Sequence, residues 1–306
     1  MKVLLALDGS APSLIARDLV AALTWPDGTV VHLLAAYQVP IDWTGGVGST
    51  MDWVGDVEDA TRETLEEEFR TLAAPLTERG LGVELHVERG RAADVITEAA
   101  AELGADLVAT GSRGRGPLRS MLLGSVAAEV AAHAPCPVLV ARGANVSRLL
   151  VATDGSSNAG LIPELLERWG IFRGTQADVV AVAVPDGPAF ELMVGLYTLG
   201  DERLAKQRRE LTAKSGADAD EMARRLTEVG IAATQHLRTG DPAAAILAAG
   251  EDRNTDLIVT GSRGLGTLER LLLGSVARNV LVHARCSVLI VRSAAGVEPP
   301  REENLT

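Results

Sequence analysis

The chain has 306 residues, 47% of them apolar, which suffices for about two domains of ordinary size. Its net charge of −12 argues against a nucleic-acid-binding protein, which needs a basic surface. The N-terminal apolar run is too short for a signal peptide, and no run approaches the roughly 20 residues of a membrane span. The two cysteines, Cys136 and Cys286, stand in apolar segments, so we interpret them as buried thiols in a reducing cytoplasm.

The first half alternates short apolar segments with longer helical ones. The apolar segments predict strands at 2–7, 29–37, 83–87, 106–110 and 137–141. The segments between them predict helices at 12–24, 58–79, 92–103 and 118–133. The strands carry Val and Leu on both faces, which is typical of a parallel sheet covered by helices on each side. The pattern therefore predicts a doubly wound α/β domain.

The second half repeats the first. GSRGRGPLRSMLLGSV at 111–126 returns as GSRGLGTLERLLLGSV at 261–276, and KVLLALDGS at 2–10 returns as RLLVATDGS at 148–156. A repeat of this length indicates a duplicated domain rather than a solenoid. We predict domains at 1–143 and 148–293 and a disordered tail at 294–306. The strands of the second domain are predicted near 148–153, 178–184, 231–237, 256–260 and 287–291.

The most polar strand ends predict where a ligand binds. In a sheet of this class, ligands bind beyond the carboxyl ends of the strands, where the strand order reverses. If the strand order is 3-2-1-4-5, the first strand, ending in Asp8, and the fourth, ending in Gly111, are neighbours there. Gly111 and Gly114 let backbone N–H groups approach a ligand closely. Gly124 and Ser125 are expected to present N–H groups and a hydroxyl at a helix N-terminus, which suits phosphate.

A cation completes this predicted phosphate site. Arg113 is positioned to pair with phosphate oxygens. The second half assigns the same roles to Gly261, Arg263, Gly264, Gly274 and Ser275. Three alternatives stay open: the glycines serve only as turns, Asp8 and Asp154 only cap the first helix, and Arg113 and Arg263 are ordinary solvated arginines.

The same residues resemble the universal stress protein family in its tandem form. The nucleotide-binding members of that family carry the motif G-x2-G-x9-G-[ST], which both glycine-rich segments fill. The resemblance covers nearly the whole chain and implies binding of ATP, ADP or AMP. The charge of bound ATP would favour a divalent cation such as Mg²⁺ near Asp8 or Asp154. The resemblance also implies strand order 3-2-1-4-5 and adenine contacts at Ala36 and Val184. The remaining residues that the resemblance assigns to the site are Gly9, Ser10, Val126, Gly155, Ser156 and Val276.

Catalysis is less clearly indicated than binding. No P-loop motif occurs, so no P-loop lysine and Ser/Thr–Mg²⁺ arrangement is encoded. The histidines show no triad-like pattern and no zinc spacing, and His133 and His283 are expected to cap the helices in which they lie. We expect a cytoplasmic ATP-binding regulator of the stress response. The alternative is a slow ATPase, or an enzyme that transfers adenylate or phosphoryl groups on the same scaffold.

Three further expectations concern the loops and the sheet edge. The segments that follow the second strand of each half are expected to act as lids, with Trp43 or Trp53 stacking on a base or packing on its own domain. The helical stretch 201–230 is expected to be longer than its counterpart and to break at Gly216. The apolar fifth strand is expected to pair the two halves as an internal pseudo-dimer, as it does in the family, and a homodimer and an unknown protein partner remain open.

Overall fold

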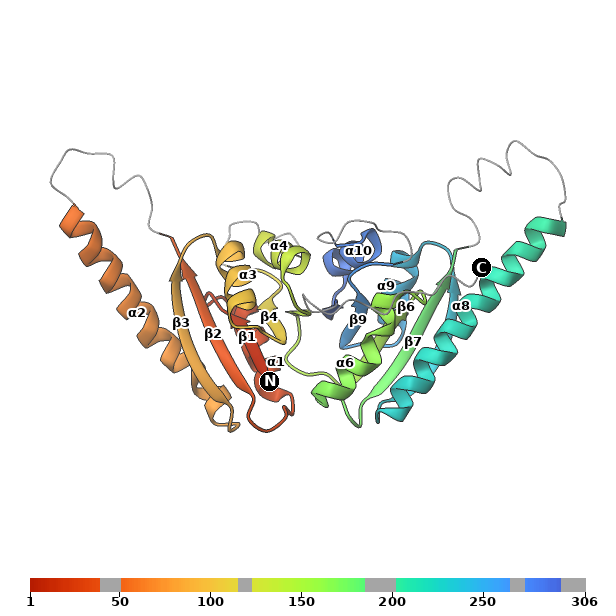
Figure 1. Cartoon of the computed structure of the whole chain (residues 1–306), viewed down its shortest axis with the longest axis horizontal. Coiled ribbons are helices and arrows are strands. Elements are labelled where there is room, and N and C mark those ends of the chain that lie inside the picture. Colours follow the sequence, from red (N-terminus) through yellow and green to blue (C-terminus); the bar gives the residue numbers. More distant parts are fainter. Residues whose placement is uncertain (39–50, 115–122, 185–201, 265–272, 293–306) are drawn as a thin grey trace. The chain divides into compact units, whose positions relative to one another are not determined.

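The computed structural model describes residues 1–38, 51–114, 123–184, 202–264 and 273–292 (Figure 1). The chain divides into two compact units, Met1–Ala144 and Asn145–Thr306. The loops expected to act as lids and the tail lie largely outside the described residues, as does Trp43. Among the described residues, no helix has the length and apolar character needed to cross a bilayer.

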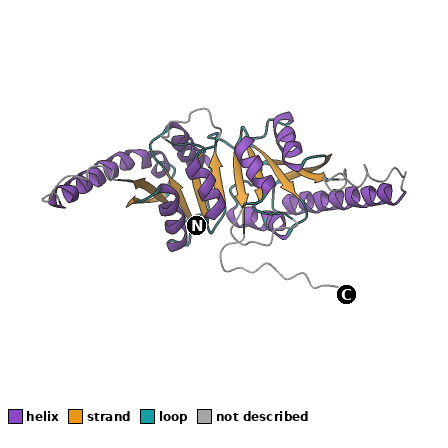
Figure 2. Ribbon diagram, turned by 90° about the horizontal axis from the view of Figure 1, so that it is seen from above, coloured by secondary structure: helices purple, strands orange, loops and turns teal. Residues whose placement is uncertain are grey.

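Unit 1 is a five-stranded parallel sheet with the strand order β3-β2-β1-β4-β5. Helices lie on both faces of its strands (Figure 2). The helix α1 packs against α2, and α3 packs against α4. The elements are β1 Lys2–Ala6, α1 Ala11–Ala22, β2 Val30–Tyr37, α2 Met51–Thr77, β3 Gly82–Arg89, α3 Ala92–Glu102, β4 Leu107–Gly111, α4 Ser125–His133 and β5 Val138–Ala141.

Unit 2 repeats this topology, with the strand order β8-β7-β6-β9-β10 and parallel pairing. The predicted fold class and strand order are therefore confirmed in both halves. Its elements are β6 Arg148–Thr153, α5 Ser157–Gly160, α6 Ile162–Trp169, β7 Gln176–Ala183, α8 Glu202–Glu228, β8 Ala232–Thr239, α9 Pro242–Asp252, β9 Leu257–Gly261, α10 Ser275–His283 and β10 Ser287–Val291.

The burial of each strand follows its place in the sheet. All five residues of β4 and all five of β9 are buried, because helices cover both faces of these central strands. The edge strands β3 and β8 are only partly buried along their lengths. Cys136 is buried as expected, whereas Cys286 is only half-buried, and neither forms a disulfide bond.

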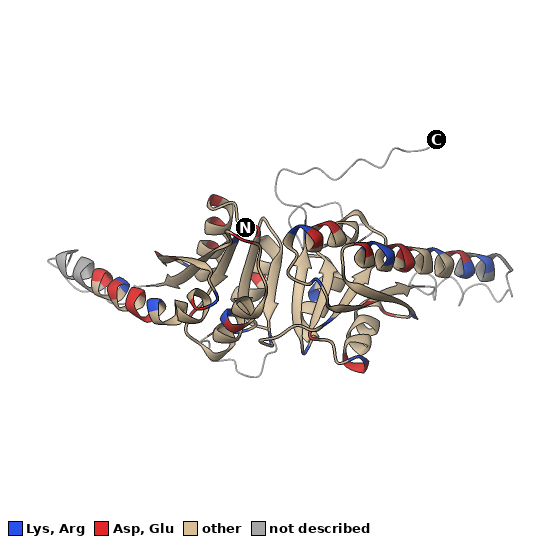
Figure 3. Ribbon diagram, turned by 90° about the horizontal axis from the view of Figure 1, so that it is seen from below, with Lys and Arg blue, Asp and Glu red and all other residues tan. Residues whose placement is uncertain are grey.

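Three predictions about the helices are wrong. The helix α4 begins at Ser125, after an N-cap at Gly124, rather than at 118. The helix α8 runs through Gly216 without a break, and α2 and α8 each have 27 residues, so neither is the longer. A single glycine costs a helix only about 1 kcal/mol. Burial of Ala219, Met222 and Leu226 on the following turns outweighs that cost. Acidic and basic residues recur along both long helices (Figure 3).

Candidate functional site

The loops after β1 and β4 meet at the carboxyl edge of unit 1. The two strands are neighbours, with Ala6 opposite Thr110. A Cβ atom added to Gly114 would lie 2.5 Å from Asp8 Oδ2, so the aspartate carboxylate lies directly against the glycine backbone. In unit 2 the same contact joins Gly264 to Asp154 Oδ2. The structure thus brings together two residues that the sequence places about 100 positions apart.

The first loop of each unit is held by its own side chains. Asp8 Oδ1 accepts a hydrogen bond of 3.0 Å from the Ser10 N–H, across Gly9 with φ 74°. Ser10 is the N-cap of α1, and its Oγ accepts from the Ser13 N–H at 3.4 Å. Asp8 therefore shapes the loop but is not the helix cap.

The first loop of unit 2 has the same arrangement. Asp154 Oδ1 accepts from the Ser156 N–H at 3.0 Å, and Gly155 has φ 72°. Ser156 is the N-cap of α5, and its Oγ accepts from the Ala159 N–H at 3.4 Å. The alternative that either aspartate merely caps the first helix is therefore wrong, because a serine fills that position in both units.

Gly111 is required by packing. A Cβ atom on Gly111 would lie 2.6 Å from the backbone carbonyl of Pro12, at the start of α1. At Gly261 the nearest atom, Ala159 N, would be 3.2 Å away, so the second copy is less crowded. Neither Gly111 nor Gly114 has a φ angle in the left-handed region. The alternative that these glycines serve as turns is not supported at the described positions, where close approach is the reason for glycine.

One N–H group that was expected to bind a ligand, that of the glycine before α4 or α10, is hydrogen-bonded within its own unit. The Gly124 N–H donates to the Ser112 carbonyl at 2.8 Å, and the Gly274 N–H donates to the Ser262 carbonyl at 2.8 Å. The expectation that Gly124 and Gly274 present free N–H groups is therefore wrong, since each bond closes its own loop.

The first turns of α4 and α10 lack a capping side chain. As N-caps, Gly124 and Gly274 have no side chain to accept hydrogen bonds from the first turn, unlike the serine caps of α1 and α5. Those first turns contain the remaining predicted residues, Ser125, Val126, Ser275 and Val276. Both serines are exposed and both valines are half-buried.

The two predicted arginines differ in exposure. Arg113 is exposed, and its Cα would lie 3.2 Å from a Cβ added to Gly124. Arg263 is half-buried, and its carbonyl accepts from Ser156 Oγ at 3.4 Å. This bond ties the glycine loop of unit 2 to its first loop.

Ala36 and Val184 do not occupy equivalent positions in the two sheets. The Tyr37 carbonyl in unit 1 and the Ala183 carbonyl in unit 2 each accept a hydrogen bond from the glycine that follows the third strand. The residue equivalent to Ala36 is therefore Val182, two positions before Val184. The sequence has no marker at this point from which the offset could have been read.

The carbonyl of Ala36 is on the side of β2 that faces β1. The β1–β2 ladder ends where the Leu7 N–H donates to the Leu34 carbonyl at 3.0 Å. Backbone groups alternate between the two sides of a strand, so Ala36 faces the same side as Leu34. The strand β1 pairs with β2 only as far as Leu34, so the Ala36 carbonyl lies beyond the end of β1, at the carboxyl edge of the sheet. Val182 has the same place in unit 2.

Two residues near the loops after β6 and β9 were not predicted from the sequence. Asp218 of α8 lies against Gly155, where an added Cβ atom would overlap its carboxylate. Ser262, after β9, is 4% exposed, and its Oγ has no hydrogen-bond partner within the described part of the chain. Asp218 gave no sequence signal, because its position depends on how a long helix packs against the sheet.

His133 and His283 bond to the helices in which they lie. The Nδ1 atom of His133 is 2.9 Å from the Glu129 carbonyl, and that of His283 is 2.9 Å from the Asn279 carbonyl. Each Nδ1 must carry the proton, since a carbonyl can only accept. These contacts agree with a role in helix capping.

Comparison with known proteins establishes the family. The universal stress protein family matches residues 1–142 and, a second time, residues 145–292. A universal stress protein of Mycolicibacterium smegmatis is 28% identical over 281 residues, covering 86% of this chain and 86% of that protein. A universal stress protein of Methanocaldococcus jannaschii is 32% identical over 156 residues, covering 50% of this chain and 87% of that protein.

A solved structure agrees on the fold. The crystal structure of a universal stress protein from Archaeoglobus fulgidus matches with a TM-score of 0.64 at 22% identity, covering 96% of this chain and 97% of that chain. The chain belongs to the universal stress protein family, in the tandem form with one family domain in each half. The resemblance noted from the glycine motif is thereby confirmed.

Proposed function

We propose that each unit binds one adenine nucleotide, ATP or its products ADP and AMP, and that the chain is a cytoplasmic regulator of the stress response. One observation carries the proposal: in both units the aspartate after the first strand contacts the second glycine of the motif, next to a helix capped by glycine. The duplicated motif and the family support an adenine nucleotide as the ligand.

The N-terminus of α4 is the proposed phosphate site. Its first-turn N–H groups, at Ser125 and Val126, point along a helix dipole that favours negative charge. A side chain at Gly114 would fill the space beside Asp8, so glycine keeps the backbone open there. Asp8 is the carboxylate that would share Mg²⁺ with the phosphates. Ser275, Val276, Gly264 and Asp154 hold the same places in unit 2.

The adenine is proposed to lie at the end of β2, over the backbone of Ala36. Register assigns this role to Val182 in unit 2, and Val184, with 44% of its surface exposed, lies next to that position. A carbonyl facing a crevice can accept a hydrogen bond from the exocyclic amine of adenine. Hydrolysis remains the alternative, but no arrangement among the described residues specifically favours it over binding.

The experiment begins with protein purified without added nucleotide. Acid denaturation followed by chromatography and mass spectrometry identifies any released nucleotide, and calorimetry of the emptied protein counts the sites for Mg·ATP. We expect about two sites per chain. Gly114→Val should remove the unit 1 site and Gly264→Val the unit 2 site, each leaving about half the stoichiometry, because Cβ would overlap the aspartate.

The control for added bulk is Gly143→Val, since a Cβ atom on Gly143 meets nothing within 4 Å. It should keep both sites. Two-site binding retained in Gly114→Val would reject the assignment of the crevice. A wild-type protein that is empty when purified and ignores added Mg·ATP would reject nucleotide binding altogether.

A further inference from the structure

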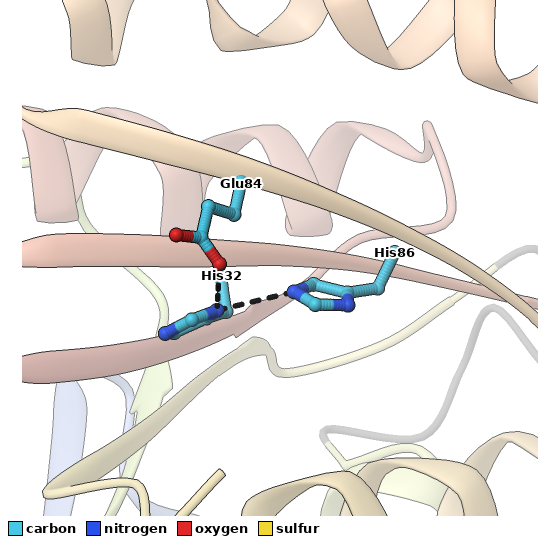
Figure 4. Close-up of side chains that lie close together, drawn as sticks. All are labelled: His32, Glu84 and His86. Atoms are coloured by element: carbon cyan, nitrogen blue, oxygen red, sulfur yellow. Dashed lines mark hydrogen bonds and ion pairs between the residues drawn. The ribbon is translucent and has the colours of Figure 1, made fainter.

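Three potential metal ligands converge on β2 and β3 of unit 1 (Figure 4). His32 Nδ1 lies 3.1 Å from His86 Nε2 and 3.3 Å from Glu84 Oε2. All three donor atoms lie within 4.8 Å of one another. Glu84 and His86 are two positions apart on β3, so their side chains lie on the same face of the sheet. His32 lies opposite Glu84 on the neighbouring strand β2. The group lies before Ala36 on β2 and includes no residue of the nucleotide crevice.

The separations suit a tetrahedral metal ion. Zinc binds histidine nitrogen and carboxylate oxygen at about 2.0–2.2 Å with tetrahedral geometry, which places neighbouring ligand atoms about 3.3–3.5 Å apart. The distances of 3.1 and 3.3 Å from His32 Nδ1 lie within a few tenths of an ångström of that value. Two histidines and one carboxylate also form the ligand set of sites that keep a fourth position for water.

In unit 2, an arginine side chain contacts the residues equivalent to His32 and His86. Register places Asp178 where unit 1 has His32, and His236 where unit 1 has His86. Arg253 donates to Asp178 Oδ1 at 2.7 Å, and its second nitrogen lies 3.1 Å from His236 Nδ1. His236 Nε2 is itself 2.8 Å from Asp178 Oδ1. A guanidinium therefore joins the carboxylate and the imidazole in this unit.

Unit 1 has no guanidinium at that position. Arg253 follows α9 as its C-cap, and the C-cap of α3 is Leu103. Leu103 has no charge, and its carbonyl accepts a hydrogen bond of 2.9 Å from Lys2 Nζ. The cluster in unit 1 therefore has a carboxylate and imidazoles, as unit 2 has in Asp178 and His236, but it lacks the arginine that bonds to them in unit 2.

His32 is a buried residue that directs one ring nitrogen at the other two ligands. His32 is 4% exposed, and its Nε2 is buried without a hydrogen-bond partner in the described part of the chain. Its other ring nitrogen, Nδ1, faces Glu84 and His86 and is the atom that would bind the ion.

We propose that His32, Glu84 and His86 bind one divalent transition-metal ion of the zinc class, with water in the fourth position. The ion joins the edge strand β3 to β2, as Arg253 joins β7, β8 and α9 in unit 2. Glu84 is exposed and His86 half-buried, so the ion enters from solvent.

The test uses the full chain, stripped of metal and nucleotide, and Zn²⁺ alone as the probe. Calorimetry should find one site per chain that is weakened at least about tenfold in Glu84→Gln and in His86→Ala, since each removes a ligand. His283→Ala is the matched control, because that imidazole is bonded to its own helix, and it should leave the affinity unchanged. Co²⁺ should give the intense visible absorption of tetrahedral coordination.

The decisive variant is Leu103→Arg, which copies the guanidinium of unit 2 into unit 1. It should abolish Zn²⁺ binding while the protein remains folded, as judged by its melting transition. Undiminished binding in both Leu103→Arg and His86→Ala, or the absence of Zn²⁺ binding in the wild-type chain, would overturn the proposal. If Leu103→Arg does not fold, Glu84→Gln and the Co²⁺ spectrum decide the outcome.

Discussion

Gly111 and Gly261 have the same place in the motif but different surroundings. In unit 1 the backbone of Pro12 leaves no room for a Cβ atom, whereas in unit 2 the nearest atom would be 3.2 Å away. We expect Gly111→Ala to destabilise unit 1 by about 1–3 kcal/mol, the usual cost of overpacking, and Gly261→Ala to cost less. Denaturant unfolding measures both. Equal losses of unfolding free energy in the two variants would show that α1 moves away from Gly111 at no extra cost.

This difference separates packing from binding within one motif. Gly111 is needed for the approach of α1 to β4, and Gly114 for its contact with Asp8. Measurements of nucleotide affinity alone would not distinguish the packing role of Gly111 from the role of Gly114 beside Asp8. A displaced α1 would also move the first loop, because Ser10 of that loop is the N-cap of α1. Stability measured without nucleotide does distinguish them, because the Gly111 contact is present in the empty protein.

At the scale of elements, α8 shows how a helix tolerates glycine. A Cβ atom on Gly216 would meet nothing within 4 Å, and the residue is helical. Gly216→Ala is therefore expected to stabilise the protein by about 0.5–1 kcal/mol, because alanine has the higher helix propensity and loses less entropy on folding. Thermal unfolding tests this. A lower melting temperature would show that α8 needs flexibility at this position.

The start of β6 depends on the ionisation of Asp256. Burial tends to raise the pKa of this carboxyl, but hydrogen bonds outweigh it and hold the pKa below its usual value of 3.8. Asp256 Oδ2 accepts from the Ser147 N–H and Oγ and from the Arg148 N–H, at 2.9, 2.7 and 2.9 Å. The equivalent Asp106 in unit 1 accepts from the Lys2 N–H at 2.9 Å.

A lowered pKa in the folded state determines the sign of the pH dependence. The stabilisation is complete above the unfolded pKa and is lost as pH falls through the lower folded value. We expect Asp256→Asn to cost about 1 kcal/mol at pH 7 and to flatten the acid branch of the stability curve below about pH 4. Amide exchange at β6 measures this locally. An unchanged acid branch in the variant would contradict it.

For the whole molecule, pairing of the halves through their fifth strands stays a prediction. Apolar edge strands such as β5 and β10 invite pairing with another strand. A protease site inserted between Ala144 and Asn145, where the two units divide, allows the intact chain to be cut after folding. The cut halves should co-elute in size-exclusion chromatography. Leu139→Lys should weaken their association, and separation of the unmutated halves would contradict the pairing.

The repeat, the apolar segments and the glycine motif allowed the duplicated fold, its strand order and the family to be predicted. These features are local: a strand or a helix start is encoded by residues next to one another, and a doubly wound sheet follows from their alternation. The break at Gly216 was predicted wrongly because burial of residues on other turns, not local propensity, decides that helix.

Only the tertiary structure decided which atoms meet. The use of the Gly124 N–H within its own loop, the offset of Val184 and the position of Asp218 all depend on pairing between distant segments. The contact of His32 with Glu84 and His86 joins two strands about 50 residues apart and follows from their register. Register is set by the packing of the whole sheet, and a shift of one residue would turn these side chains to the opposite face.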